Sequence, residues 1–149
     1  MTDDLARQSS GKTIPPVLAT GETVVATFAP SRATYVKEHI MLAAIASVAG
    51  AGLLIFAGSE HAWTGVVGAL AAIAVRGIYV ASEALGQTWT LTDRRLIAPS
   101  GMNIPRARIA RARTIFSAAQ VITDTGDKHM IKYLSDPAAA VRIIEKDRT

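Results

Sequence analysis

An uncharged apolar run from Ile40 to Ala57 constrains this chain more than any other feature of its sequence. Charged residues bracket the run, with Lys37 and Glu38 before it and Glu60 after it. As a helix, these residues would be about 27 Å long, close to the roughly 30 Å hydrocarbon core of a bilayer. The sequence therefore predicts a transmembrane helix here.

A second apolar run, 62–81, contains a single charge, Arg76. Arg76 lies about 7.5 Å from the end of the predicted helix, so its guanidinium can reach the headgroups by snorkelling. We do not expect a signal peptide, because the first run starts near position 40 and a second follows it. The short link 58–61 therefore predicts an antiparallel transmembrane hairpin over residues 38–83, with spans at about 40–57 and 62–81.

Basic residues near the two runs predict how the hairpin is oriented. They all lie outside the link, with Arg32 and Lys37 before the first run and Arg76, Arg94 and Arg95 near or after the end of the second. The positive-inside rule then predicts a multi-pass protein of the bacterial inner (cytoplasmic) membrane with both termini in the cytoplasm.

Small residues recur at four-residue spacing in both runs, as in membrane helices whose backbones approach closely. The candidate helix-packing residues are Ala43, Ser47, Ala51, Gly65, Gly68, Ala69 and Ala72. Ala and Gly are common in such helices, so the alternative is that these faces meet lipid.

The segments before the hairpin differ in character. Residues 1–20 are polar and include Pro15-Pro16, a composition typical of a flexible tail. The β-branched run Thr23–Phe28 predicts a strand within residues 21–32, which could join a sheet formed after the hairpin.

After the hairpin, Trp89 and Leu91 alternate with threonines, a pattern that predicts a half-buried strand. Asp136-Pro137 predicts the start of a helix over 138–146. Between these elements, further strands are expected at 95–98, 114–116, 120–123 and 128–134. Residues 84–149 are therefore predicted to be a small cytoplasmic domain of antiparallel strands with a C-terminal helix.

Several short segments resemble the bacterial PH-like membrane proteins, a family once catalogued as a domain of unknown function. They are Gly21-Glu22, Pro30-Ser31-Arg32, Trp89 to Ile97, Ile104-Pro105, Gly126-Asp127 and Asp136-Pro137, of which Leu91-Thr92-Asp93-Arg94-Arg95-Leu96 is the most specific. Arg106 is a departure, because such proteins usually carry an apolar residue there. The resemblance implies an α+β membrane protein, with a two-helix transmembrane hairpin followed by a small antiparallel PH-like sheet or barrel and a C-terminal helix.

A narrower similarity is to the PH-domain assembly factors of purple-bacterial photosynthetic complexes. It rests on Gly126-Asp127-Lys128-His129 and on Tyr133-Leu134-Ser135-Asp136-Pro137. This similarity implies an accessory or assembly role in a membrane complex.

Basic residues dominate the predicted cytoplasmic domain, with 11 basic and 6 acidic side chains from Ala84 onward. The candidate partner- or lipid-binding residues are Arg94, Arg95, Arg106, Arg108, Arg111 and Arg113. They could dock on anionic headgroups or on an acidic partner, and the alternative is a solvated face that only follows the positive-inside rule. We do not expect nucleic-acid binding, because no aromatic residues are interleaved with the arginines.

Catalytic and cofactor motifs are not found in the sequence. Cysteine is absent, and His39 and His61 lie at opposite ends of the predicted hairpin, too far apart to share a haem iron. No nucleophile elbow, phosphate loop or zinc motif can be placed, so we expect neither enzymatic activity nor a cofactor.

These features together predict a non-enzymatic accessory subunit or assembly and stabilising factor of a bacterial membrane protein complex. Its expected partners are membrane lipids and a larger integral membrane complex. The alternative is a lipid-binding module that recognises anionic headgroups of the inner leaflet.

Overall fold

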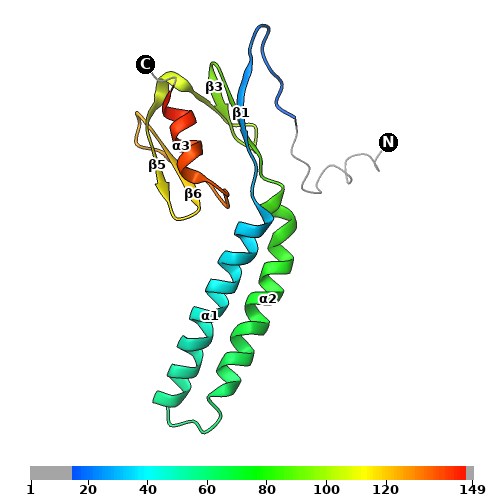
Figure 1. Cartoon of the computed structure of the whole chain (residues 1–149), viewed down its shortest axis with the longest axis vertical. Helices are drawn as coiled ribbons and strands as arrows, with labels where there is room; N and C mark the ends of the chain where they lie inside the picture. Colours follow the sequence, from blue (N-terminus) through cyan, green and yellow to red (C-terminus); the bar gives the residue numbers. More distant parts are fainter. Residues whose placement is uncertain (1–14, 147–149) are drawn as a thin grey trace, which may run out of the picture. The chain divides into compact units, whose positions relative to one another are not determined.

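The structure is a computed structural model that describes residues 15–146, and the chain divides into two compact units (Figure 1). The hairpin unit is Tyr35–Ser82. The sheet unit combines the chain up to Thr34 with the chain from Glu83 onward. Most of the predicted tail 1–20 lies outside the described residues, and 15–20 has no regular helix or strand. The hairpin is therefore an insertion within the sequence of the sheet unit.

Two antiparallel helices form the hairpin, α1 (Arg32–Phe56) and α2 (Trp63–Leu85). At about 1.5 Å per residue they are about 37 Å and 34 Å long, and both are apolar enough to cross a membrane. Only Tyr35 and Ser47 are buried in α1, and no residue of α2 is buried. The apolar side chains of both helices therefore point mainly outward.

The backbones of the two helices are in contact at Gly50 and Gly65. A Cβ atom added to Gly65 would lie 2.6 Å from the carbonyl carbon of Gly50, so the contact is between backbones. Ser47 is buried on the same side of α1. Glycine at position 65 thus allows a helix contact that any side chain would obstruct.

The predicted packing residues divide between two sides of the helices. Those at least partly buried are Ala43, Ser47 and Ala51 on α1 and Gly65 and Ala69 on α2. Gly68 and Ala72 are exposed, and a Cβ atom at Gly68 would meet nothing within 4 Å. The expected contact through Gly68 and Ala72 is corrected accordingly. Gly68 lies three residues after Gly65, and Ala72 lies three residues after Ala69. Three residues correspond to a rotation of about 60° around the helix axis, which turns Gly68 and Ala72 away from the contact.

The sheet unit is α+β, with two antiparallel sheets and a C-terminal helix. The first sheet has the order β1 (Val24–Phe28), β2 (Trp89–Thr92), β3 (Arg95–Ile97) and β4 (Asn103–Pro105). The second has the order β5 (Ile109–Ile115), β6 (Ala118–Thr123) and β7 (Lys128–Ile131), and the 3-10 turn η2 (Arg106–Arg108) joins the sheets. Helix α3 (Pro137–Lys146) follows. Strand β1 pairs with β2 across the inserted hairpin, with Phe28 opposite Trp89.

One apolar core is shared by both sheets and α3. Its largest fully buried apolar side chains are Leu91, Leu96, Val121, Ile131 and Ile144, each at most 1% exposed. Helix α3 packs against β5 and β6. Among the described residues no strand pairing joins the two sheets, so the barrel implied by the resemblance is not closed.

The strands between 98 and 115 differ from the prediction. β4 was not expected, and β5 begins at Ile109 rather than at 114. β4 has three residues and ends in a proline, so it lacks an alternating pattern. A bulge between Ile109 and Arg111 breaks the alternation in β5, since a bulge places two residues opposite one.

The Gly50–Gly65 contact predicts a position-specific effect of alanine. Gly65→Ala should destabilise the hairpin by about 1–3 kcal/mol, because its methyl group would overlap the backbone of α1. Gly68→Ala is the matched control and should change stability by no more than about 1 kcal/mol. Thermal unfolding of the full chain in mild detergent, followed by circular dichroism, measures both. Equal melting temperatures for the two variants would contradict the backbone contact.

Candidate functional site

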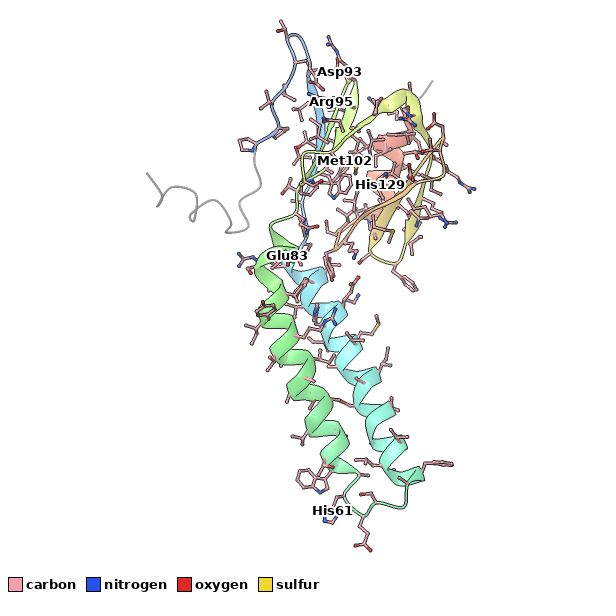
Figure 2. All side chains as sticks on the ribbon, turned by 180° about the vertical axis from the view of Figure 1, so that it is seen from behind. His61, Glu83, Asp93, Arg95, Met102 and His129 are labelled. Carbon is pink, nitrogen blue, oxygen red and sulfur yellow. The ribbon has the colours of Figure 1, made fainter. Side chains whose placement is uncertain are left out.

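The Glu22 carboxylate in the sheet unit is held by an ion pair with Arg95. Figure 2 labels Arg95 in the sheet unit, close to Asp93. Arg95 Nε donates to Glu22 Oε1 and NH2 donates to Oε2, both at 2.8 Å. The Thr92 hydroxyl and the Ala19 amide each donate to the carboxylate at 2.7 Å. The Glu22 side chain is only 1% exposed. This ion pair is therefore a buried part of the fold.

The same contacts set the protonation of Glu22. Hydrogen bonds from Arg95, the Ala19 amide and Thr92 lower the pKa of Glu22 from its usual 4.5 to about 2. Next to them, Asp93 Oδ1 accepts a hydrogen bond of 2.9 Å from the Thr23 amide. The Gly21-Glu22 and Leu91–Leu96 segments, which carry the family resemblance, thus meet in one hydrogen-bonded cluster. Arg95, which was predicted to bind a partner or lipid, instead binds Glu22 within this cluster.

Arg106 is also used by the fold. It is only 9% exposed, and its NH1 donates to the Thr92 carbonyl at 3.4 Å. Its own amide donates to the Arg94 carbonyl at 2.9 Å. The position where PH-like membrane proteins usually carry an apolar residue is thus buried in this chain and occupied by an arginine.

Two further predicted arginines lie in exposed pairs at the ends of strands. Arg94 is 3.8 Å from Asp93, and Arg108 is 3.2 Å from Asp124. All four side chains are 40–56% exposed. Exposed ion pairs of this kind contribute about 0–1 kcal/mol to stability, so they do little to hold the fold. Each arginine also lies beside a carboxylate, so its charge is matched.

The remaining two, Arg111 and Arg113, lie on one face of the second sheet. Ala112 between them points into the core beneath α3, so the two arginines occupy the opposite face. Across the three strands, Arg111 lies opposite Ile122, and Ile122 lies opposite Lys128. In the neighbouring row, Arg113 lies opposite Gln120, and Gln120 lies opposite Met130. We call these six residues the basic sheet face. The six predicted arginines therefore do not form one cluster.

Arg113 is held in a defined position on this face. Its Nε donates to Gln120 Oε1 at 2.7 Å, which leaves the terminal NH groups of the guanidinium directed away from this bond. The Gln120 amide lies 3.5 Å from Met130 Sδ. β5, β6 and β7 contain no Asp or Glu. The face thus presents Arg111, Arg113 and Lys128 beside Gln120, Ile122 and Met130, with Arg113 held in place by Gln120.

Sequence reasoning missed Gln120, Ile122, Lys128 and Met130. The strands containing them were predicted, but spacing along the chain does not give the register between strands. The register places Lys128 two strands away from Arg111 on the same face.

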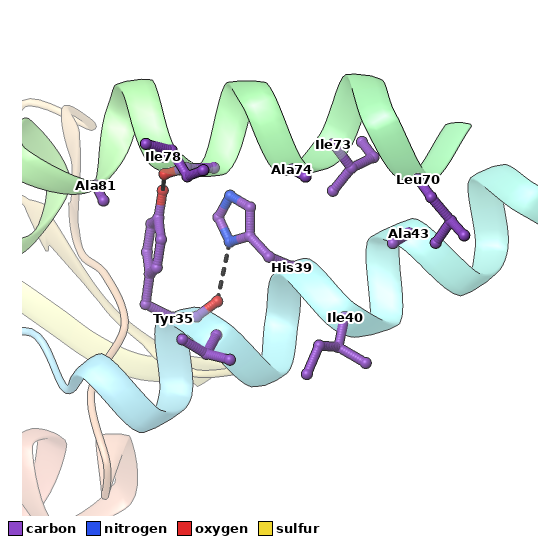
Figure 3. A pocket seen from close by; sticks show the side chains of 11 residues that line it. Tyr35, His39, Ile40, Ala43, Leu70, Ile73, Ala74, Ile78 and Ala81 are labelled. Carbon is purple, nitrogen blue, oxygen red and sulfur yellow. Dashed lines mark hydrogen bonds between the residues drawn. The ribbon is translucent and has the colours of Figure 1, made fainter. Parts of the chain in front are cut away.

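The hairpin unit contains an apolar groove between α1 and α2, with a volume of about 530 Å³ (Figure 3). At one end, Tyr35 Oη donates to the Gly77 carbonyl at 2.8 Å, and His39 Nδ1 lies 2.9 Å from the Tyr35 carbonyl. A Cβ atom at Gly77 would lie 3.1 Å from His39 Cδ2. Tyr35 thus ties the two helices together. The groove suits an acyl chain better than a polar substrate.

A smaller polar cavity of about 190 Å³ lies in the sheet unit, between β4 and the β6–β7 end. Arg108, Asp127 and His129 are among its lining residues. It is smaller than the roughly 300–1,000 Å³ of typical ligand pockets. Within residues 15–146, no three His, Asp or Glu side chains are grouped so as to hold a metal ion. The basic sheet face is therefore the stronger candidate site.

The Glu22 cluster predicts how stability depends on pH. The folded pKa is about 2 and the usual value is 4.5, so the stabilising effect of the carboxylate is complete above about 4.5 and is lost as pH falls towards 2. Glu22→Gln should therefore lower stability at neutral pH and flatten its decline between pH 4.5 and 2. Trp89 fluorescence during denaturant unfolding, in a Trp63→Phe background, reports on the sheet unit.

Asp124→Asn is the control for the Glu22 test, because it removes a carboxylate from an exposed arginine pair. It should leave both stability and its pH dependence almost unchanged. An unaltered pH dependence in Glu22→Gln would mean that the carboxylate has no special role.

Comparisons of the chain with protein-family models, with curated proteins and with solved structures found no match. A functional proposal therefore rests on the residues of this chain.

Proposed function

We propose that this protein is a non-enzymatic accessory subunit or assembly factor that is anchored in the bacterial inner membrane and docks on an acidic surface of a larger integral membrane complex. The observation that carries the proposal is the basic sheet face. Its cations Arg111, Arg113 and Lys128 lie on a sheet whose other face packs on α3, and the three strands supply no acidic side chain.

The exterior of the hairpin supports membrane anchoring. Val48, Leu53 and Ile78 are between 68% and 79% exposed, and many other apolar residues of α1 and α2 are also exposed. Leaving apolar surface in water costs about 25 cal/mol per Å², a cost that a bilayer removes. The basic residues near the helices then favour cytoplasmic termini and a cytoplasmic sheet unit.

Two properties of the basic sheet face favour a protein over a lipid surface. Gln120 holds Arg113 so that its guanidinium is oriented, which suits the two-pronged hydrogen bonding of a carboxylate. Ile122 lies between Arg111 and Lys128 in the register, Met130 follows two residues after Lys128 on the same strand, and both are half-buried, so apolar surface lies beside the cations. A negative leaflet attracts charge without requiring either property.

The buried polar side chains favour a non-catalytic role. Glu22, Thr92 and Arg95 bind one another and the backbone, and Arg106 binds the Thr92 carbonyl. The cations of the basic sheet face lie on an exposed surface outside both cavities. Such an arrangement suits docking better than chemistry.

Topology can be tested with reporter fusions. Fusions after Thr149 should report the cytoplasm, and fusions inserted at residues 58–61 should report the periplasm, because the basic residues flank the hairpin on its terminal side. A periplasmic signal from the C-terminal fusion would exclude the proposed hairpin orientation.

Substitutions in the basic sheet face test the docking surface. Arg111→Gln with Arg113→Gln should reduce partner retention at least tenfold, equivalent to about 1.4 kcal/mol. Arg111→Lys with Arg113→Lys should also reduce retention, because lysine lacks the planar donor pair. Retention is measured by purification in mild detergent and quantification of the co-purifying membrane proteins.

Arg142→Gln with Lys146→Gln is the matched control, since it removes two exposed cations from α3 instead. This control should retain its partners fully. Equal losses of partner retention in the control and test variants would mean that retention depends on net charge alone. Full retention by the lysine variant would show that positive charge, and not the geometry of the guanidinium, holds the partner.

A further inference from the structure

Phe116 at the turn between β5 and β6 has an unusual combination of properties. Its side chain is 92% exposed, so it contributes little to the core of the sheet unit. Its φ is 51°, a left-handed conformation that favours glycine or asparagine over an aromatic residue. Neither packing nor turn geometry therefore accounts for a phenylalanine here.

The Phe116 turn lies at the end of the sheet unit where the chain passes into the helices. The Leu134 amide donates to the Ser117 carbonyl at 2.8 Å, and the Ser31 amide donates to the Tyr133 carbonyl at 2.7 Å. The segment Tyr133–Leu134 thus connects the turn to the residue just before α1. The Phe28–Trp89 pair closes β1 and β2 at the same connections to the hairpin.

Basic side chains flank this end of the sheet unit. Lys132 is exposed and immediately precedes Tyr133, and Arg32 is exposed in the first turn of α1. The nearby Asp136 accepts a hydrogen bond of 2.8 Å from the Ala139 amide at the start of α3. An exposed aromatic side chain at the same end of a domain as an exposed lysine and an exposed arginine is typical of contacts with the interface of an anionic bilayer.

We propose that Phe116 inserts into the headgroup region of the inner leaflet, with Lys132 and Arg32 at the anionic headgroups. The inference rests on the proposed membrane hairpin, but it adds a second contact between the protein and the lipid. This contact limits the rotation of the sheet unit and thereby orients the basic sheet face. It uses neither Arg111 nor Arg113, so the lipid and partner contacts are separate.

Site-directed spin labelling tests the contact on the full chain, because the sequence contains no native cysteine. Phe116→Cys is labelled in nanodiscs of phosphatidylcholine with phosphatidylglycerol. Collisions with oxygen, which partitions into lipid, are compared with collisions with a water-soluble nickel chelate. We expect accessibility to the nickel chelate to be several-fold lower at position 116 than at a labelled Thr125→Cys.

Thr125 is the matched control, because it is exposed in the turn at the opposite end of β6, about 20 Å from Phe116 along the strand. A label at Leu53→Cys in α1 distinguishes the two ways of failing. A lipid-exposed Leu53 with a water-exposed position 116 would overturn the inference alone, whereas a water-exposed Leu53 would overturn the proposed hairpin. A label at 116 that is shielded from both reagents would indicate a protein contact instead of lipid.

Phe116→Asn supplies a variant that keeps the fold, because asparagine accepts the left-handed conformation better than phenylalanine. Its thermal stability should equal or exceed that of the unmodified chain. In the same nanodiscs, a label at Thr125→Cys should become more mobile when Phe116→Asn is added. Unchanged mobility would overturn the proposed restraint on the sheet unit.

Discussion

The ion pair between Glu22 and Arg95 is the interaction on which the sheet unit most depends. It joins residues 73 positions apart, on either side of the inserted hairpin. Burying two charges costs desolvation energy that their attraction does not always recover, so its value lies more in specificity than in net stability. A shift of one residue between β1 and β2 would separate Glu22 from Arg95 and move the core side chains of β1 to the other face. The pair thus fixes the register of β1, which has only five residues.

The inserted hairpin makes this register achievable. The chain leaves the first sheet after Phe28 and must return to it at Trp89. The entropic cost of closing a loop grows slowly with its length, and an antiparallel helix pair removes most of this cost by holding its two ends together. The Gly50–Gly65 backbone contact and the Tyr35–Gly77 hydrogen bond keep the two helices together at positions far apart along the hairpin. The hairpin therefore favours the pairing of β1 with β2 through chain connectivity.

The elements that the sequence predicts well are those whose pattern is local. Eighteen uncharged residues in succession, the alternation from Trp89 to Thr92 and the Asp136-Pro137 helix start each produce the expected element. β4 was missed because three residues carry no periodic pattern, and the start of β5 was missed because a bulge breaks its alternation. Gly68 and Gly65 could not be distinguished by spacing, since both lie in four-residue patterns of small residues. The rotation of α2 about its axis decides that Gly65 faces α1 and Gly68 does not.

The roles of the charged residues were the hardest to predict, because they depend on contacts between segments that are far apart in the sequence. The positive-inside rule counts every arginine equally, but the fold gives them different roles. Arg95 and Arg106 are used inside the sheet unit, and Arg94 and Arg108 lie beside carboxylates at the ends of strands. Arg111 and Arg113 remain on a face that gains Lys128 through strand register. Under the proposed function, the excess of positive charge that orients the hairpin also provides the cations for docking, and strand pairing determines which of them share one face.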